Sequence, residues 1–221
     1  MSTDLALPEP LPPDPLPLFL EWFKEAAARR TQPNPDAMVV ATAASNGDPS
    51  ARVLLCKRVV VDPGYIVFFT NYQSRKGREL AARPRAAAVL HWDALHRQVR
   101  IEGPIVRSPD SESDEYFASR ALESRIAAWA SAQSEPLASR ETLQERVREM
   151  TARFGIAPGA TSGTVPRPPH WGGNRLWVER MELWAEGANR VHDRAVWTRQ
   201  LQPAGEHGFT SGPWRSTRLN P

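Results

Sequence analysis

The stretch from Met38 to Val61, MVVATAASNGDPSARVLLCKRVVV, has the pattern of two strands joined by a tight turn. Its first part, Met38–Ala44, is apolar and β-branched, as residues on the pleated surface of a sheet commonly are. Asn46-Gly47-Asp48-Pro49 follows as a turn, and Arg52–Val61 is the return strand. The stretch therefore predicts an antiparallel hairpin.

Short strands continue after this hairpin. Asp62-Pro63-Gly64 is another tight turn, and the strands predicted beyond it are Tyr65–Thr70, Ala86–Trp92, Gln98–Val106, Leu176–Ala185, about Val191–Thr198 and Trp214–Arg218. Residues 201–213 are expected to form an extended, mobile hairpin loop. The absence of βαβ alternation and of a G-x-G-x-x-G motif disfavours a dinucleotide-binding Rossmann domain. The pattern predicts a mainly β (α+β) fold, a β-barrel or strongly curved antiparallel sheet.

Helices are predicted on the outside of this sheet. They are Leu18–Arg30, Arg75–Ala82 with Ser74 as its N-cap, segments from Ser108 to about Ala132, and Ser139–Phe154. Residues 1–17 are rich in proline and are expected to form an extended arm rather than part of the core. Residues 18–221 are expected to form one domain.

Composition argues against several classes of protein. No apolar run is long enough to span a bilayer, and the N-terminal residues lack the basic and apolar regions of a signal peptide, which favours the cytoplasm. Cys56 is the only cysteine, which excludes an intrachain disulfide and a cysteine-based zinc site. The five histidines are scattered, so no metal is expected. The net charge of +3 is small for a nucleic-acid-binding protein.

Two basic clusters follow the predicted turn of the first hairpin. Arg52 and Lys57 are an odd number of residues apart, so a regular strand would send them to opposite faces unless a bulge lies between them. Arg75 and Lys76 follow Ser74 at a predicted helix start, where free backbone N–H groups and cations coincide. That helix start is either a phosphate site or a solvated helix face.

A third set of polar residues has helical spacing. Tyr116, Arg120 and Ser124 are four residues apart, so one continuous helix would bring them to one face. Two hydroxyls and a guanidinium could bind a phosphate monoester, or they could form an ordinary polar surface. The spacing alone does not decide between these alternatives.

A fourth set has strand spacing. Arg190, His192 and Arg194 alternate along a predicted strand and would point to the same side of it. Three cationic or potentially cationic groups on one face repel each other unless an anion lies among them. This set therefore favours a binding function.

Nine segments, in order and with the same spacing, resemble the pyridoxine/pyridoxamine 5'-phosphate oxidase family. Together they cover roughly residues 16–221. They are RVLLCK at 52–57, FTN at 69–71 with SRK at 74–76, RQV at 97–99, YFASR at 116–120, WASAQS at 129–134, WGG at 171–173, ELW at 182–184, RVHDR at 190–194 and RLNP at 218–221. Each segment alone is weak evidence for the family, but nine segments in the same order and spacing are a specific signal.

The resemblance implies an FMN-binding split β-barrel whose two equivalent sites lie at the interface of a homodimer. The flavin-binding residues that it implies, some of them from the other subunit, are Arg52, Val53, Leu54, Leu55, Cys56, Lys57, Phe69, Thr70, Arg75, Lys76, Gln98, Gln133, Ser134, Trp184 and Arg194. The implied clamp for the substrate phosphate is Lys57, Tyr116, Arg120 and Ser124. Arg190 and His192 match the substrate-binding and catalytic groups over the pyridine ring.

The implied reaction belongs to vitamin B6 metabolism. Pyridoxine or pyridoxamine 5'-phosphate would be oxidised to pyridoxal 5'-phosphate, with a hydride passing to flavin N5 and dioxygen reduced to hydrogen peroxide. Neither a nucleic acid nor a membrane is an expected partner. Phe69 stands where the family commonly has a tyrosine, and the proline-rich arm lacks the arginine and tyrosine of the family's N-terminal lid.

Two other functions compete with this interpretation. A related FMN oxidase of secondary metabolism, of the phenazine-biosynthesis type, would keep the flavin motifs but depart at the phosphate clamp, which this chain retains. A non-catalytic split barrel that binds flavin or haem is a further alternative, because the fold alone does not determine function.

Overall fold

The computed structural model describes residues 6–157 and 159–221, and strands are the most frequent regular element in it. Ten of them form one curled sheet: β1 (Ala37–Ala43), β2 (Pro49–Leu55), β3 (Arg58–Val60), β4 (Tyr65–Asn71), β5 (Arg85–Trp92), β6 (Arg97–Arg107), β7 (Trp171–Trp177), β8 (Arg180–Ala185), β9 (Asp193–Thr198) and β12 (Arg215–Leu219). β10 (Leu201–Pro203) and β11 (Phe209–Ser211) pair separately as a hairpin. The predicted curved antiparallel sheet is confirmed.

The long strand β6 makes the sheet curl. One edge of β6 pairs with β5, while the other pairs with β8 through Arg97–Glu102 and then with β7 through Ile105–Arg107. Gly103 lies where β6 changes partner, and a Cβ there would come within 1.9 Å of the Trp177 carbonyl oxygen. Only glycine allows this close approach. The sheet thus divides into a β12-β9-β8-β6-β5-β1-β2 path and a β6-β7-β4-β3 branch.

The predicted first hairpin forms, but its return strand is shorter than expected. β1 and β2 pair antiparallel with Val39 opposite Val53. The strand predicted over Arg52–Val61 breaks after Leu55: the Cys56 N–H still donates to Asp36 on the β1 side, whereas the Lys57 N–H donates to Val67 of β4. The chain changes partner strand between these two residues. Arg52 and Lys57 therefore do not lie on one regular strand, so their odd spacing does not place them on opposite faces of it.

The strand predicted over Leu176–Ala185 is likewise two strands. β7 begins at Trp171 and β8 at Arg180, with Val178 and Glu179 between them. The Val178 N–H donates to Gly64 and the Glu179 N–H donates to Glu102, so the chain again passes from one neighbour to another. The last strand, β12, begins one residue later than predicted.

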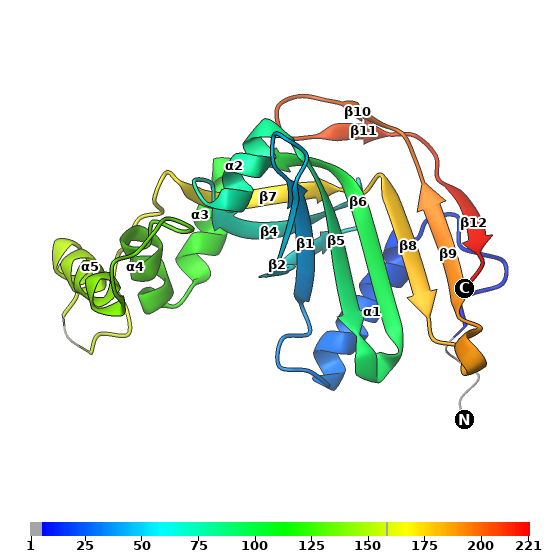
Figure 1. Cartoon of the computed structure of the whole chain (residues 1–221), viewed down its shortest axis with the longest axis horizontal. Coiled ribbons are helices and arrows are strands. Elements are labelled where there is room, and N and C mark those ends of the chain that lie inside the picture. The colour runs from blue at the N-terminus through cyan, green and yellow to red at the C-terminus, as the bar shows by residue number, and fades with distance from the viewer. Residues whose placement is uncertain (1–5, 158) are drawn as a thin grey trace.

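In the part of the chain that the structure describes, five α-helices lie around the sheet: α1 (Leu16–Arg29), α2 (Arg75–Ala82), α3 (Asp110–Ser119), α4 (Leu122–Ala130) and α5 (Arg140–Arg153). α1 lies behind the sheet in Figure 1 and buries Leu16, Phe19, Trp22 and Ala26 in its core. α4 and α5 project beyond the opposite end from β9 and β12, around a second apolar cluster that contains Phe117 and Ile126. We call α3–α5 the helical lobe.

The described part of the N-terminal arm contributes to the core, contrary to the expectation from its prolines. Leu7 and Leu16 are buried, and Leu11 packs against the same cluster. Pro12 accepts a hydrogen bond from the Trp197 indole N–H, 2.8 Å away, which ties the extended segment to β9. Leucines between the prolines supply the apolar contacts. Residues 1–5 of the predicted arm lie outside the described residues.

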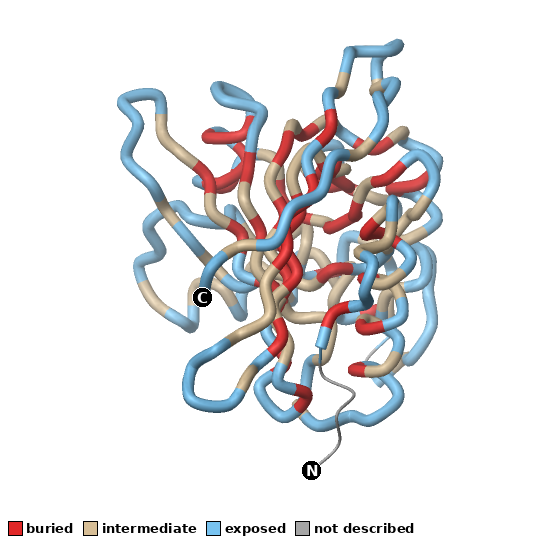
Figure 2. The backbone as a smooth tube through the Cα atoms, turned by 90° about the vertical axis from the view of Figure 1, so that its right-hand side faces the viewer, coloured by how far each residue is buried: buried red, intermediate tan, exposed pale blue. Residues whose placement is uncertain are grey.

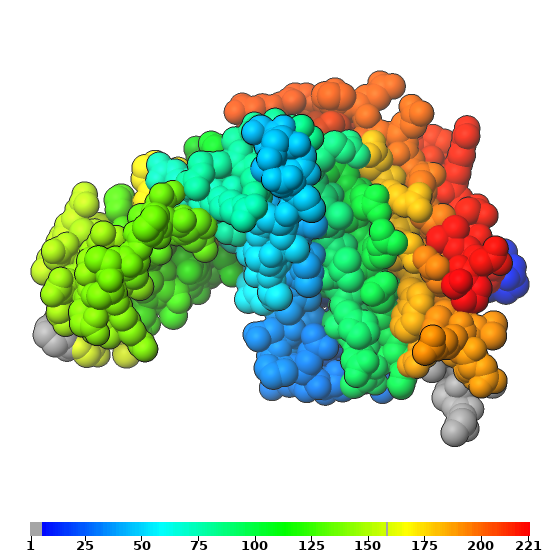
Figure 3. Space-filling view, in the orientation of Figure 1, coloured from blue at the N-terminus to red at the C-terminus, as the bar shows by residue number. Residues whose placement is uncertain are grey.

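Burial and shape locate the surface available for a site. In Figure 2 buried residues concentrate in the middle of the sheet, while the hairpin ends are exposed. Figure 3 shows a hollow between the helical lobe and the β1–β2 hairpin. No helix in the described part of the chain is both long and apolar enough to cross a membrane.

Candidate functional site

The first group of predicted residues meets at the N-terminus of α2. Ser74 caps this helix by accepting a hydrogen bond from the Gly77 N–H, as predicted. Arg75 donates to Glu79 at 2.8 Å, and Arg52 reaches the same carboxylate from β2 at 3.3 Å. Burial opposes ionisation of Glu79, but hydrogen bonds from Thr42, Arg75, Ser50 and Arg52 outweigh it and lower its pKa to about 2. Glu79 is therefore a fixed anion between two cations.

Lys76 adds a third cation that Glu79 does not pair with directly. Its side chain is 5% exposed, and its Nζ lies 3.1 Å from Ser74 Oγ and 3.3 Å from Gln133 Oε1. Burial, followed by the nearby charge of Arg52, lowers the Lys76 pKa to about 8. Three cations with one carboxylate leave excess positive charge at a helix N-terminus. This arrangement suits an anion with several oxygens, such as a phosphate group.

Three aromatic rings form a stack beside this cluster. The Phe69 ring lies 3.9 Å from the Tyr116 ring and 5.5 Å from the Trp171 ring, and all are nearly parallel. The guanidinium of Arg120 lies over Trp171, 4.7 Å from the ring centroid. Arg120 Nη1 is buried and has no hydrogen-bond partner among the described residues. Burial lowers the pKa of Arg120, since no carboxylate offsets the cost of the charge.

Arg120 opens onto a cavity of about 240 Å³ between α4, β4 and β7. The cavity is lined by Asn71, Arg120, Ser124, Ala127, Ala128, Ser131, Gln133 and Trp171. The structure thus brings two of the predicted clamp residues, Arg120 and Ser124, together with the predicted flavin residue Gln133. An unpaired guanidinium and a hydroxyl facing one small cavity form a second place for an oxyanion.

The helix that was predicted to align Tyr116, Arg120 and Ser124 is not continuous. α3 ends at Ser119, Arg120 is extended with φ −75° and ψ 151°, and α4 begins at Leu122. Tyr116 therefore faces the aromatic stack, whereas Arg120 and Ser124 face the cavity. The fourth clamp residue, Lys57, lies at the break between β2 and β3, where its Nζ pairs with Asp36 at 2.6 Å.

A second group lies across the paired strands β6, β8 and β9. Gln98 is opposite Trp184, and Trp184 is opposite Arg194. Arg194 is fixed by the buried carboxylate of Glu182, 2.8 Å away, and donates to the Asn220 carbonyl at 3.0 Å. The His192 ring lies 4.7 Å from the Trp184 ring.

Arg190, His192 and Arg194 were predicted to lie on one strand. In the structure only Arg194 lies on a strand. β9 begins only at Asp193, and a short turn of 3₁₀ helix covers Ala188–Arg190. Asn189 and Arg190 have positive φ values of 54° and 64°. The cause is the tight closure of this turn, in which a Cβ on Gly187 would lie 1.7 Å from the Val191 carbonyl oxygen. The three groups therefore do not form one row on a sheet face.

The turn nevertheless orients His192. The Gly187 N–H donates to His192 Nδ1 at 3.2 Å. Because Nδ1 accepts this bond, the proton of the neutral imidazole is assigned to Nε2. His192 is thus set to donate a hydrogen bond through Nε2, while the Arg190 side chain is exposed to solvent.

The two groups are separated within one chain. The connection from β8 to β9 lies at the opposite end of the sheet from the helical lobe (Figure 1). The other predicted flavin residues do not all lie in the first group. Cys56 is part of the main hydrophobic core and Leu54 packs against it. Thr70 is buried, Leu55 is partly buried, Val53 is 65% exposed and Ser134 is exposed. Burial also raises the Cys56 pKa to about 12, so this thiol stays protonated at neutral pH.

Several residues of these clusters were missed by the sequence prediction: Asp36, Thr42, Ser50, Asn71, Glu79 and Trp171. Glu79 could have been found, since it follows Arg75 by four residues in a correctly predicted helix. Thr42 and Ser50 carry no local signal, because they meet Glu79 only through the β1–β2 pairing.

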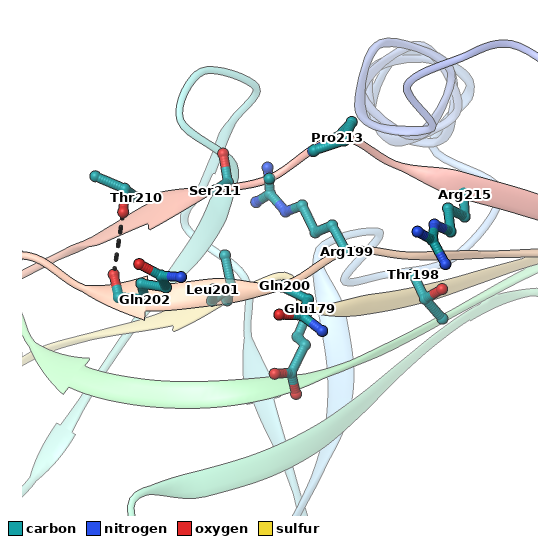
Figure 4. A pocket seen from close by; sticks show the side chains of 11 residues that line it. Glu179, Thr198, Arg199, Gln200, Leu201, Gln202, Thr210, Ser211, Pro213 and Arg215 are labelled. Atoms are coloured by element: carbon teal, nitrogen blue, oxygen red, sulfur yellow. Dashed lines mark hydrogen bonds between the residues drawn. The ribbon is translucent and has the colours of Figure 1, made fainter.

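A larger hollow of about 920 Å³ contains none of the predicted residues (Figure 4). It lies beside the β10–β11 hairpin, and the buried Arg199 points into it. Arg199 donates to the carbonyls of Val178 and Gly64, at 2.8 and 2.9 Å, and stacks on Trp214. These bonds tie the hairpin base to the β3–β4 turn, which is a structural role. Within residues 6–157 and 159–221, no group of three or more His, Cys, Asp and Glu side chains could hold a metal ion.

Comparison with known proteins covers nearly the whole chain. A family model described as pyridoxamine 5'-phosphate oxidase matches residues 24–154, and one described as the pyridoxine 5'-phosphate oxidase C-terminal dimerisation region matches residues 171–221. A protein of Burkholderia vietnamiensis named pyridoxine/pyridoxamine 5'-phosphate oxidase is 52% identical over 209 residues, which are 95% of this chain and 90% of the relative. One of Cupriavidus necator with the same name is 46% identical over the same shares.

Two solved structures are similar in fold. PhzG from Burkholderia lata 383, in complex with tetrahydrophenazine-1-carboxylic acid, matches with a TM-score of 0.80 and 30% identity, over 100% of this chain and 98% of that one. A pyridoxamine 5'-phosphate oxidase-related, FMN binding protein from Nostoc punctiforme matches with a TM-score of 0.63 and 17% identity, over 90% and 94% of the two chains.

Proposed function

The chain belongs to the pyridoxamine 5'-phosphate oxidase family, and we propose that it oxidises pyridoxine or pyridoxamine 5'-phosphate to pyridoxal 5'-phosphate as an FMN-dependent homodimer. When bound, FMN would accept the hydride from the substrate's C4' carbon and pass the electrons to dioxygen, giving hydrogen peroxide. The protein's part is to hold two phosphorylated aromatic molecules in a reactive orientation. Family membership supports the reaction class, and the charges of this chain support the substrate.

The N-terminus of α2 fits the phosphate of FMN. Arg52, Arg75 and Lys76 supply excess positive charge there, and the lowered pKa of Lys76 indicates a cation that lacks a full counter-charge. A phosphate dianion would supply that charge. In this proposal Gln133 and Ser134 approach from the loop after α4, and the 52–57 segment lies along the flavin.

The observation that carries the proposed substrate is the buried Nη1 atom of the partly exposed Arg120. Its Nη1 has no partner among the described residues, and it faces a cavity that also holds Ser124. A buried donor without an acceptor is costly, so the position favours a ligand that supplies oxygens. The phosphate of the substrate would do this, with Tyr116 and Lys57 completing the clamp once Lys57 exchanges Asp36 for the ligand.

His192 and Arg190 would act at the pyridine ring. Gly187 holds the His192 imidazole with Nε2–H available, so His192 donates a hydrogen bond to the reacting substituent rather than taking its proton. The β8–β9 turn lies far from the helical lobe in one chain. We therefore propose that a second copy supplies Arg190 and His192, with Gln98, Trp184 and Arg194, to the first copy's cavity. The C-terminal match to a dimerisation region supports this assignment.

A second candidate is an oxidase that acts on a phenazine precursor. The likeness to PhzG over the full chain favours it, whereas the 52% identity to a named vitamin B6 enzyme and the unpaired Arg120 favour a phosphorylated substrate. A phenazine carboxylic acid carries no phosphate for the clamp.

The test uses the purified protein loaded with FMN. Anaerobic addition of pyridoxine 5'-phosphate should bleach the flavin absorbance, and air should restore it with release of hydrogen peroxide. Arg120→Ala should raise the KM for this substrate by roughly 10- to 100-fold, because a charge-assisted pair is worth about 1.5–3 kcal/mol. Bound FMN with no bleaching would contradict the proposed substrate and leave the phenazine-type candidate.

A further inference from the structure

The turn that carries Arg190 and His192 ends at Asp193, whose carboxylate holds both ends of the chain. Asp193 Oδ2 accepts the Leu7 N–H at 2.8 Å, and Oδ1 accepts Nη1 of Arg218. These partners lie 186 and 25 residues away in the sequence. Asp193 therefore connects the start of β9 to the N-terminal segment at Leu7 and to the last strand at Arg218.

Arg218 extends this connection. Its Nη2 donates to Glu9 Oε2 at 2.7 Å and to the Pro8 carbonyl at 3.1 Å. Arg194 also donates to Asn220 near the C-terminus. The N-terminal segment and the last strand therefore converge on the first two residues of β9.

The turn itself needs external support. Asn189 and Arg190 are consecutive non-glycine residues with positive φ, a conformation that L residues rarely adopt. Such backbone persists only where surrounding contacts hold it. On one side the turn is closed by two hydrogen bonds, from the Gly187 N–H to His192 Nδ1 and from the Val191 N–H to the Ala188 carbonyl. On the other side the support comes from Asp193.

We propose that Asp193 is a positioning residue: by binding Leu7 N–H and Arg218 together, it keeps the 187–192 turn in the shape that presents Arg190 and His192. The inference rests on the role of these two residues in the proposed function. It also assigns a purpose to the N-terminal segment, which acts from behind the turn as a fastening and not as a cover over the substrate.

The kinetic test compares Asp193→Asn with Arg218→Ala in FMN-loaded protein. Each should lower kcat roughly 10- to 100-fold, because small displacements of orienting groups are costly, while FMN affinity and the KM set by the phosphate clamp stay within about twofold. The double variant should be no slower than the slower single variant, since both remove one connection. Arg218→Lys should recover part of the loss. Arg215→Ala is the matched control on the same strand, because Arg215 is exposed and has no ion pair among the described residues.

Amide hydrogen exchange provides a readout that does not depend on turnover. In Asp193→Asn, residues 187–192 should exchange faster while β6 and β8 keep their protection. A folded, flavin-loaded variant with wild-type kcat and unchanged exchange would overturn the proposal; if Asp193→Asn does not fold, Arg218→Ala decides it by the same two measurements. Failure of the wild-type protein to oxidise either vitamer would instead refute the proposed function, and exchange would still report whether Asp193 holds the turn.

Discussion

At the scale of single residues, the candidate site is defined by cations whose counter-charges are incomplete. The Glu79 carboxylate accepts hydrogen bonds from four side chains, so its negative charge is balanced inside the protein. Lys76 and Arg120 have no such partner, and burial lowers the pKa of both. Nearly buried cations of this kind destabilise the empty protein and favour an anionic ligand.

Lys76 should make flavin binding depend on pH. Its pKa of about 8 in the empty site is below the ordinary 10.5, and a bound phosphate raises it again by favouring the charged amine. Binding above pH 8 therefore takes up a proton, and FMN affinity should fall by up to about tenfold per pH unit until the pKa of the complex is reached. Fluorescence titration of the apoprotein between pH 7 and 9.5 measures this.

Lys76→Arg is the control for that titration, because arginine stays charged over the same range. Its FMN affinity should be nearly constant with pH. An equal decline in both proteins would show that another group titrates. Without flavin the sign reverses: the free energy of unfolding should rise between pH 8 and 10.5, since the folded state sheds this proton before the unfolded state does.

At the scale of elements, the site depends on where helices and strands start and stop. α2 begins directly after Asn71–Ser74 and places its N-terminus beside Arg52. The break at Arg120 between α3 and α4 turns this side chain into the cavity, which a continuous helix would not do.

Gly77→Ala should disrupt the first of these junctions. A Cβ at Gly77 would lie 2.1 Å from the Tyr72 carbonyl oxygen, so α2 would have to move away from the turn that follows β4. We expect FMN affinity to fall at least tenfold and the melting temperature to drop by several degrees, as overpacking costs about 1–3 kcal/mol. Gly212→Ala is the control, since the nearest atom to its Cβ would be 3.7 Å away. Unchanged flavin binding in Gly77→Ala would show that the position of α2 is not critical.

At the scale of the whole molecule, the curled sheet separates the two groups of site residues. β6 joins both halves, so the helical lobe lies beyond one end and the β8–β9 turn beyond the other (Figure 1). In the proposed function, a second chain would bring the second group to the helical lobe of the first, and the two-fold symmetry of a dimer would complete two sites at once.

Mixing two inactive variants tests this arrangement. With substrate well below the raised KM of Arg120→Ala, the Arg120→Ala and His192→Ala homodimers should each have little activity. Unfolding and refolding them together should restore roughly a quarter of wild-type activity, because half of the dimers are mixed and each has one intact site. Arg120→Ala refolded with Ser124→Ala should restore nothing, since every site then carries a change. No recovery in the first mixture would place Arg120 and His192 in one chain's site.

The elements that depend on neighbouring residues could be predicted from the amino-acid sequence. α2 spans Arg75–Ala82 with Ser74 as its cap, as predicted, and the 38–55 hairpin forms at the predicted turn. Capping, turn chemistry and strand alternation act over a few residues, so these elements are evident without the fold. The short family motifs are also visible in the sequence, and the resemblance that they carry predicted the split-barrel fold.

The places where the chain passes from one partner strand to another could not be predicted in this way, because they depend on long-range contacts. The break at Cys56–Lys57, the bend at Arg120, the turn at 187–192 and the fastening of Leu7 and Arg218 to Asp193 each depend on groups far away in the sequence. A strand stops where its neighbour's hydrogen-bonding edge ends, and a buried charge is tolerated where distant donors and acceptors meet it. Neither the end of a neighbouring strand nor the presence of distant polar partners can be recognised from the residues next to such a position in the sequence.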